Sequence, residues 1–360
     1  MGDVLHLATR KGLFLLRRGA AGWAVARVSF LGDPVSAVLE EPRRGTLYAA
    51  LALGHFGVKL RRSDDAGATW TEVAAPAFPE GLADGPDGKG PSVQQVWALA
   101  AGGDGALWAG TIPGALFRSD DRGASWALAR PLWDRPERRA WMGGGYDQPG
   151  LHSICTDPRD SGRLACAVST GGVWVTADAG ATWACRADGM HAAYMPPERR
   201  HDPNAQDVHR MVRCPAAPDV LWAQHHNGVF RTVDGGRRWV EVTAIRPARF
   251  GFAVAVHPRD PDTAWFVPGV KDECRVPVDG ALAVARTRDG GRTFDVLRAG
   301  LPQAHAYDLV YRHALDVDEA GSGLAMGSTT GNVWASDDGG ERWTLLSSHL
   351  PPVYQVAFGR

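Results

Sequence analysis

One short motif recurs along most of the chain and constrains the fold more than any other feature of the sequence. Residues 119–126 read Ser-Asp-Asp-Arg-Gly-Ala-Ser-Trp, and near-copies occupy 63–70, 177–183, 233–239, 288–294 and 337–343. A seventh, decayed copy at 16–23 keeps the Gly and the Trp but has lost the Asp. The copies end at the aromatic residues Trp23, Trp70, Trp126, Trp183, Trp239, Phe294 and Trp343.

The spacing of these aromatic residues is nearly constant, at 47, 56, 57, 56, 55 and 49 positions. A repeat of this length is typical of a solenoid or a propeller. Within one repeat the pattern predicts four short strands, at 96–100, 107–110, 115–118 and 126–129. A lone four-stranded sheet cannot bury both of its faces, and radial stacking of such sheets leaves only short edges. We therefore expect an all-β propeller.

The two ends of the chain predict how the ring closes. Strands at 4–8, 13–17 and 23–28 have no inner strand before them, whereas 353–358 is left over after the last repeat. We expect this C-terminal segment to pair with the N-terminal strands and to complete a seventh blade. Because the repeat runs from end to end, we expect residues 1–360 to form a single domain.

At the family level, Ser-x-Asp-x-Gly-x-Thr-Trp repeats at this interval resemble the Asp-box (BNR-repeat) propellers. That superfamily is similar across sialidases, xyloglucan-cleaving glucanases, sortilin-type receptors and photosystem assembly factors, so the resemblance implies a fold and leaves the function open. It implies that each box lies at a turn between strands. We expect its Asp and Ser or Thr to bond turn backbone groups while its aromatic residue packs between sheets.

Composition argues against several classes of partner. A net charge of −1 and a pI near 6.9 predict neither a nucleic-acid nor an anionic-membrane surface. No signal-like or membrane-spanning apolar run is present, so we expect a cytoplasmic protein. An odd number of cysteines without CxxC spacing predicts buried thiols rather than disulfides or a thiolate zinc site: Cys155, Cys166, Cys185, Cys214 and Cys274.

Propeller topology predicts where a site would form. The loops that enter the inner strands open on one face, together with the loops between the second and third strands of each blade. Aligned inner strands place these residues near the central channel: Ser36, Val96, His152, His209, Phe252, Asp308 and Gln355. His225 and His226, in a loop between second and third strands, should reach the same opening.

Three long insertions are predicted on this His-rich face, at about 131–150, 184–208 and 268–280. Long loops in compact folds often carry function. The insertions contribute reactive and aromatic side chains, among them Tyr146, Asp147, Tyr194, Arg199, Asp207 and Glu273.

The first functional hypothesis is an enzyme with a divalent metal ion, zinc, iron or copper, held by imidazoles. The predicted metal ligands are His152, His209, His225 and His226. The predicted catalytic residues, which would move a proton or complete the metal site, are Asp308, Asp207, Glu273 and Tyr146. The predicted substrate-binding residues are Asp147, Tyr194, Arg199 and Gln355. Such an enzyme would be a metal-assisted hydrolase or lyase acting on a small molecule.

Other hypotheses remain open. The histidines would equally serve as hydrogen-bonded lining groups of the channel, and the same face would then hold a protein partner in a non-catalytic scaffold. A sialidase-like glycosidase is a lesser alternative, since several carboxylates could pair across the opening. The Arg-Ile-Pro element of sialidases has no match near Arg10, however, and xyloglucanases have a longer chain with two propellers.

Overall fold

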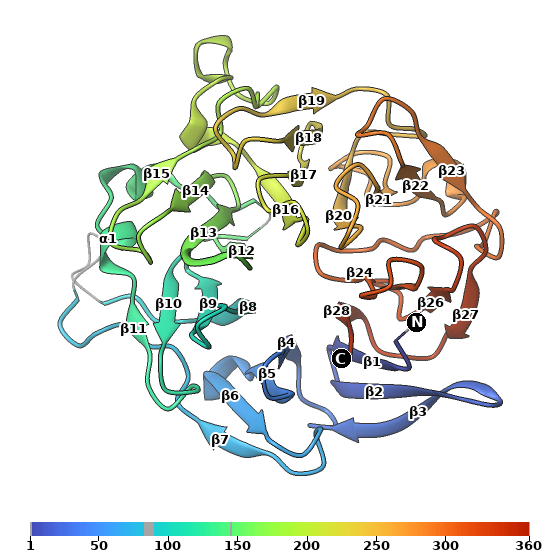
Figure 1. Ribbon diagram of the computed structural model, residues 1–360, viewed down its shortest axis with the longest axis horizontal. Coiled ribbons are helices and arrows are strands. Elements are labelled where there is room, and N and C mark those ends of the chain that lie inside the picture. The colour runs from blue at the N-terminus through green and yellow to red at the C-terminus, as the bar shows by residue number, and fades with distance from the viewer. Residues whose placement is uncertain (1, 83–89, 145, 360) are drawn as a thin grey trace.

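The computed structural model describes residues 2–82, 90–144 and 146–359. Seven four-stranded antiparallel sheets are arranged around a central axis, with one strand of each sheet innermost (Figure 1). The all-β, seven-bladed propeller predicted from the repeats is therefore confirmed. No helix among the described residues is long and apolar enough to cross a membrane.

Each blade pairs its strands in order, from the axis outward. The closing blade has the order β28-β1-β2-β3, with β28 Val353–Phe358, β1 Val4–Thr9, β2 Gly12–Gly19 and β3 Gly22–Ser29. The next two blades comprise β4 Val35–Glu41, β5 Thr46–Ala52, β6 Val58–Ser63 and β7 Thr71–Val73, then β8 Gln95–Ala101, β9 Leu107–Ile112, β10 Leu116–Ser119 and β11 Ala127–Leu128. The fourth and fifth comprise β12 Leu151–Asp157, β13 Asp160–Val168, β14 Gly172–Thr176 and β15 Ala184–Cys185, then β16 Val208–Arg213, β17 Leu221–His225, β18 Gly228–Thr232 and β19 Val240–Val242. The last two comprise β20 Gly251–Val256, β21 Ala264–Pro268, β22 Val284–Thr287 and β23 Asp295–Leu297, then β24 Leu315–Val317, β25 Leu324–Gly327, β26 Val333–Ser336 and β27 Thr344–Ser347.

Helical segments are short and lie in the connections between strands. The single α-helix in the described residues, α1, spans Arg130–Trp133. The 3-10 turns are η1 Gly54–Phe56, η2 Pro136–Ala140, η3 Pro197–Arg199, η4 Pro203–Ala205 and η5 Val278–Gly280. Four of the five, η2 to η5, lie within the three predicted insertions, so these insertions are folded segments on the blades that carry them.

The ring is closed by strand pairing between the two ends of the chain. Strand β28 pairs antiparallel with β1, and Val353 and Val356 of β28 are buried. The side-chain amide of Gln355 also bridges to the next blade, because its Oε1 accepts from the Val38 amide and its Nε2 donates to the Val38 carbonyl, both at 2.9 Å. The predicted closure is confirmed, and Gln355 contributes to it directly.

Side-chain hydrogen bonds within each Asp-box stabilise its turn. In the box of the β12–β15 blade, Asp178 accepts from the amide and hydroxyl of Thr182 at 2.8 and 2.6 Å. Thr176 accepts from the amide of Gly180, which has the left-handed φ of 92° that favours glycine. The same pattern of contacts recurs at Asp65 and Asp121. The box residues thus stabilise the turn between the third and fourth strands of the blade.

A β-bulge near the start of the inner strand is a second repeated feature. In six of the seven described sheets the pairing of the inner strand shifts by at least one residue there. Such a bulge redirects the side chains that follow it. The bulged positions are Ser36, Trp97, His152, His209, Phe252 with Ala253, and Tyr354.

This register corrects the sequence alignment in three blades. Trp97 rather than Val96 occupies the bulge of β8, and Tyr354 rather than Gln355 occupies that of β28. Asp308 does not open an inner strand, because β24 begins only at Leu315. Arg312 comes near the axis in its place, with its guanidinium over the rings of both Trp97 and Phe252.

Candidate metal centre

Three side chains on the His-rich face form a compact group of potential metal ligands. Asp207, His209 and His226 each offer one ligand atom, and these atoms lie within 4.8 Å of one another. Oδ2 of Asp207 is 3.6 Å from Nε2 of His209 and 3.4 Å from Nδ1 of His226. Two atoms bound tetrahedrally to one zinc ion at its usual bond lengths lie about 3.4 Å apart. The three residues therefore fit a shared divalent ion.

The local chain course explains why these residues meet. Asp207 ends the 184–208 insertion, and His209 is the bulged second residue of β16. His226 follows β17, whose register on β16 brings its backbone amide to the carbonyl of Asp207 at 2.9 Å. A carboxylate and two imidazoles from one blade are thus fixed by a backbone ladder, which positions ligands more firmly than a free loop would.

The tautomer of His209 is set by the neighbouring blade. Nδ1 of His209 lies 2.7 Å from the carbonyl oxygen of Gly251, an acceptor only, so Nδ1 carries the proton. In the neutral ring the lone pair is then on Nε2, which faces Asp207. A backbone carbonyl that orients the far nitrogen in this way is the usual second partner of a metal-bound histidine. The ring is also stacked on Phe252, with centroids 4.4 Å apart.

Electrostatics keeps Asp207 ionised in spite of its burial. Burial alone would raise the pKa of Asp207. The charge and hydrogen bond of His209 in its protonated form, together with the hydrogen bond of His226, outweigh burial and hold that pKa well below its usual range. The hydrogen bond to Asp207 raises the pKa of His226, against the opposing effect of partial burial. Oδ1 of Asp207 has no hydrogen-bond partner among the described residues. A buried carboxylate with a free oxygen is the feature that a cation would satisfy.

His225 lies beside this centre and is excluded from it by its own proton. Its Nδ1 accepts a hydrogen bond from the amide of Asn227 at 3.1 Å, so the neutral ring carries its proton on Nε2. Burial, with smaller effects from nearby charges, lowers the pKa of His225 to about 3. Its ring packs edge-on against Phe230. Of the two adjacent histidines, it is therefore His226 that faces Asp207.

His152 is close to the centre but belongs to a different set of contacts. It is fully buried, its ring lies edge-on to Trp97, and its Nδ1 is 2.9 Å from the hydroxyl of Ser153. Burial, followed by the charge of Arg312, holds the pKa of His152 well below its usual value. Nε2 of His152 has no hydrogen-bond partner in the described part of the chain. This neutral imidazole is not within the three-residue ligand group.

Two consecutive residues of the β24 blade reach across the axis to the opposite side of the ring. Nε2 of His313 lies 2.6 Å from the carbonyl oxygen of His152. Arg312 is buried between Trp97 and Phe252, and its Nε and Nη2 have no hydrogen-bond partner among the described residues. Burial lowers the pKa of Arg312, and the largest opposing effect is the charge of Asp207. Sequence alignment missed Arg312 because it placed the inner-strand position of this blade at Asp308, whereas β24 begins only at Leu315.

Gly144, in the first insertion, lies against the carboxylate of Asp207. A Cβ atom added at Gly144 would lie 3.0 Å from Oδ1 and 3.2 Å from Oδ2 of Asp207. On the other side Tyr194 packs edge-on against His226, with ring centroids 4.8 Å apart, and its hydroxyl donates to the Ala205 carbonyl at 2.8 Å. Two of the three predicted insertions therefore contact the ligand group, one at Asp207 and the other at His226.

The remaining predicted residues lie farther from the ligand group or have other partners. Oδ1 of Asp308 accepts from Ser328, Thr330 and Asn332, so this carboxylate fixes a turn of its own blade. Tyr146 is half exposed and lies edge-on to Trp97. Other predicted residues lie at the surface, where Asp147 is exposed, Glu273 pairs with Lys271 and Arg199 pairs with Asp202.

Comparisons with known proteins support the fold. Neither the models of known protein families nor the sequences of curated proteins give a match. An ancestral GH74 enzyme is similar in structure, with a TM-score of 0.59 and 16% identity over 87% of this chain. This chain spans only 37% of that enzyme's length. YCF48 from Cyanidioschyzon merolae has a TM-score of 0.56 and 14% identity, covering 88% of this chain and 87% of its own. YCF48 bound to D1 peptide has a TM-score of 0.51 and 15% identity, covering 94% and 91%. The chain thus shares its fold with a GH74 enzyme and with YCF48.

Proposed function

We propose that this propeller is a divalent-metal-dependent hydrolase or lyase that acts on a small anionic molecule. The proposal rests on the group of Asp207, His209 and His226. Nε2 of His209 presents a lone pair there, and Oδ1 of Asp207 has no hydrogen-bond partner among the described residues. Two imidazoles and one carboxylate leave coordination positions open, as catalytic metal sites require. An ion held there would polarise a substrate oxygen or activate a bound water.

Arg312 supplies the argument for an anionic substrate. A buried guanidinium without a carboxylate partner is costly, and a substrate carboxylate or phosphate would satisfy it. Arg312 lies close enough to Asp207 for their charges to interact, so one substrate would contact both the ion and this guanidinium. Binding at two points would fix the reacting group relative to the ion. Tyr146, which shares contact with Trp97, and Glu273 remain the candidates for moving a proton.

Metal binding by purified protein tests this proposal. We expect about one equivalent of zinc, iron or copper to bind the wild-type protein and to be lost in His209→Ala and His226→Ala variants. His349→Ala, at an exposed histidine outside the site, is the matched control and should retain the ion. The proposal is wrong if the wild-type protein binds no transition metal, or if the three variants bind it equally.

Turnover then separates an enzyme from a binding protein. Substrates that place a carboxylate or phosphate beside a hydrolysable or eliminable bond should be consumed by the wild-type protein, and a chelator should stop the reaction. Arg312→Met should lower turnover of such substrates at least tenfold while leaving metal binding intact. Equal turnover by that variant would contradict the role given to Arg312.

A second candidate function is a scaffold that holds a protein partner on the same face. Large exposed apolar side chains are present on loops that open on that face: Leu31, Phe56, Met142, Tyr146, Tyr194, Val270 and Tyr307. A contiguous apolar patch formed by such side chains would mark an interaction site. The shared fold with YCF48, one structure of which is bound to D1 peptide, is consistent with this candidate. Metal-free protein that stays metal-free on incubation with zinc, iron and copper would favour it.

A further inference from the structure

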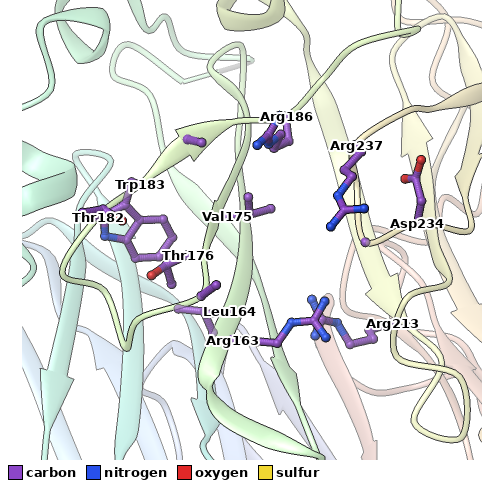
Figure 2. Close-up of a pocket in the computed structure, with 13 residues that line it drawn as sticks. Arg163, Leu164, Val175, Thr176, Thr182, Trp183, Arg186, Arg213, Asp234 and Arg237 are labelled. Atoms are coloured by element: carbon purple, nitrogen blue, oxygen red, sulfur yellow. The ribbon is translucent and has the colours of Figure 1, made fainter.

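A polar cavity lies between two neighbouring blades, and none of the candidate metal ligands lines it. It measures about 290 Å³ and opens between the blades β12–β15 and β16–β19, where their Asp-box turns are close together. Figure 2 shows four arginines around it, Arg163 and Arg213 at the bottom of the view and Arg186 and Arg237 above them. Leu164, Val175 and Trp183 add apolar lining. No sequence motif pointed to this site, because its arginines come from four separate segments.

Two of the lining arginines, Arg163 and Arg213, belong to an ion-pair network that contains more positive than negative charge. A single buried carboxylate, Asp157, is shared by Arg159, Arg163 and Arg213, whose nearest nitrogen atoms lie 2.8, 3.3 and 3.4 Å from its Oδ2. Asp219 pairs with Arg159 and Arg163 at 3.2 and 2.9 Å. Three guanidinium groups thus share two carboxylates.

Arg213 is the buried cation of the group. It is the last residue of β16, its side chain is only 7% exposed, and its Nε has no hydrogen-bond partner in the described residues. Its Nη1 faces Asp157 at ion-pair distance without forming a hydrogen bond. A buried guanidinium with unsatisfied donors is costly unless another group accepts from it. In Figure 2 the side chain points into the cavity.

The outer end of the cavity adds two further cations. Arg186 and Arg237 are exposed, and neither side chain makes an ion pair with any residue that the structure describes. The one carboxylate in the lining, Asp234, accepts from the Thr232 hydroxyl and the Arg238 amide of its own box. The lining itself contains four arginines and one carboxylate. With Arg159, Asp157 and Asp219, which join the lining arginines in one ion-pair network without lining the cavity, five guanidinium groups stand against three carboxylates, a surplus of two positive charges.

We propose that this cavity binds a phosphate group, either as the free ion or as the end of a small phosphorylated molecule. A phosphate dianion would match the surplus of two charges, and its oxygens accept the paired N–H bonds that guanidinium groups present. The cavity is wide enough for one phosphate and a small attached group, which would lie against Trp183. The site is separate from the candidate metal centre, and its occupancy does not depend on the proposed enzymatic function.

Calorimetric titration tests the proposal with two probes, inorganic phosphate and phenyl phosphate, at about 50 mM salt so that screening stays weak. We expect saturable binding of at least one of them. Equal affinity for both would identify the free ion as sufficient, and tighter binding of phenyl phosphate would identify a phosphate ester as the preferred form.

Variants at the cavity rim keep the test independent of folding, because Arg186 and Arg237 are exposed. The double variant R186Q/R237Q should bind either probe at least tenfold more weakly than the wild type. R238Q is the matched control, since Arg238 is exposed, follows Arg237 directly and does not line the cavity. R213Q should abolish binding if it folds. The proposal is overturned if the wild type shows no saturable binding of either probe, or if R186Q/R237Q and R238Q bind equally.

Discussion

Oδ2 of Asp207 faces Nε2 of His209 across 3.6 Å, while Nδ1 of the same ring lies 2.7 Å from the carbonyl oxygen of Gly251. The ring proton is therefore directed away from the carboxylate. In the neutral state a lone pair and a negative charge face each other, and only an added proton or a metal cation makes this contact favourable. This contact distinguishes the three-residue group from buried polar residues that satisfy one another by hydrogen bonds.

Adding one methyl group at Gly144 should disturb the centre without touching a ligand. Because its Cβ would lie 3.0 Å from Oδ1 of Asp207, either the insertion or the carboxylate must shift. We expect Gly144→Ala to weaken metal binding about tenfold, in line with changes beside metal ligands in other proteins. Competition with a chromophoric chelator measures this. Gly103→Ala is the control, since its Cβ would meet no atom within 4 Å, and equal affinities of both variants would refute the expectation.

Replacing Arg312 by Met should lower turnover without lowering the free energy of unfolding. The guanidinium is buried, and replacement of a buried charge by an apolar side chain of similar size is often neutral or stabilising by about 1–4 kcal/mol. We expect the free energy of unfolding in urea to stay equal or rise, although turnover falls. The exposed control Arg342→Met should change stability by no more than about 0.5 kcal/mol. A loss of several kcal/mol in Arg312→Met would show that the residue is kept for structure.

The Asp-box carboxylates should contribute to stability only above acidic pH. Hydrogen bonds from Thr182, first its hydroxyl and then its amide, lower the pKa of Asp178 to about 2, and Ser125 lowers that of Asp121 in the same way. Because these folded pKa values are depressed, the stabilisation is present above the unfolded pKa near 3.8 and is lost as pH falls toward 2. Asp178→Asn should therefore be less stable at pH 6 and show a flatter decline in melting temperature between pH 4 and pH 2. The control Asp188→Asn, at an exposed residue, should show the same pH dependence of melting temperature as the wild type. The expectation is wrong if Asp178→Asn also behaves like the wild type.

Closure of the ring should depend on the apolar side chains of β28. Val356 is buried in that strand, and its truncation to Ala should lower the free energy of unfolding by about 1–3 kcal/mol. Leu345→Ala is the control, because that side chain on β27 is half exposed and should cost much less. Chemical denaturation measures both. Equal small effects would mean that pairing of β28 with β1 contributes little to stability.

The fold was predictable because the Asp-box marks each blade independently of its other residues. Each box supplies its own turn contacts, such as those between Asp178 and Thr182, so the repeat is visible in a single sequence. The closing strand was predicted with its observed bounds, Val353–Phe358. The N-terminal blade lacked an inner strand, and this C-terminal segment was the one strand left to supply it.

The candidate site was predictable only in part. Asp207, His209 and His226 were all among the predicted residues, but the hydrogen bond that ties the proton of His225 to Nε2 depends on a loop amide that no pattern reveals. A bulge shifts the alternation of an inner strand by one residue, which is why Val96 was predicted at the position that Trp97 occupies. Arg312 was missed because it precedes a strand of only three residues.

Anomalous diffraction from crystals soaked in zinc at low concentration tests the metal centre most directly. We expect a single strong peak at the zinc edge about 2.0–2.2 Å from Nε2 of His209 and from a carboxylate oxygen of Asp207, with His226 as the third ligand. A peak bound to His152 or His225 instead, or no peak near Asp207 at full occupancy of other sites, would contradict it.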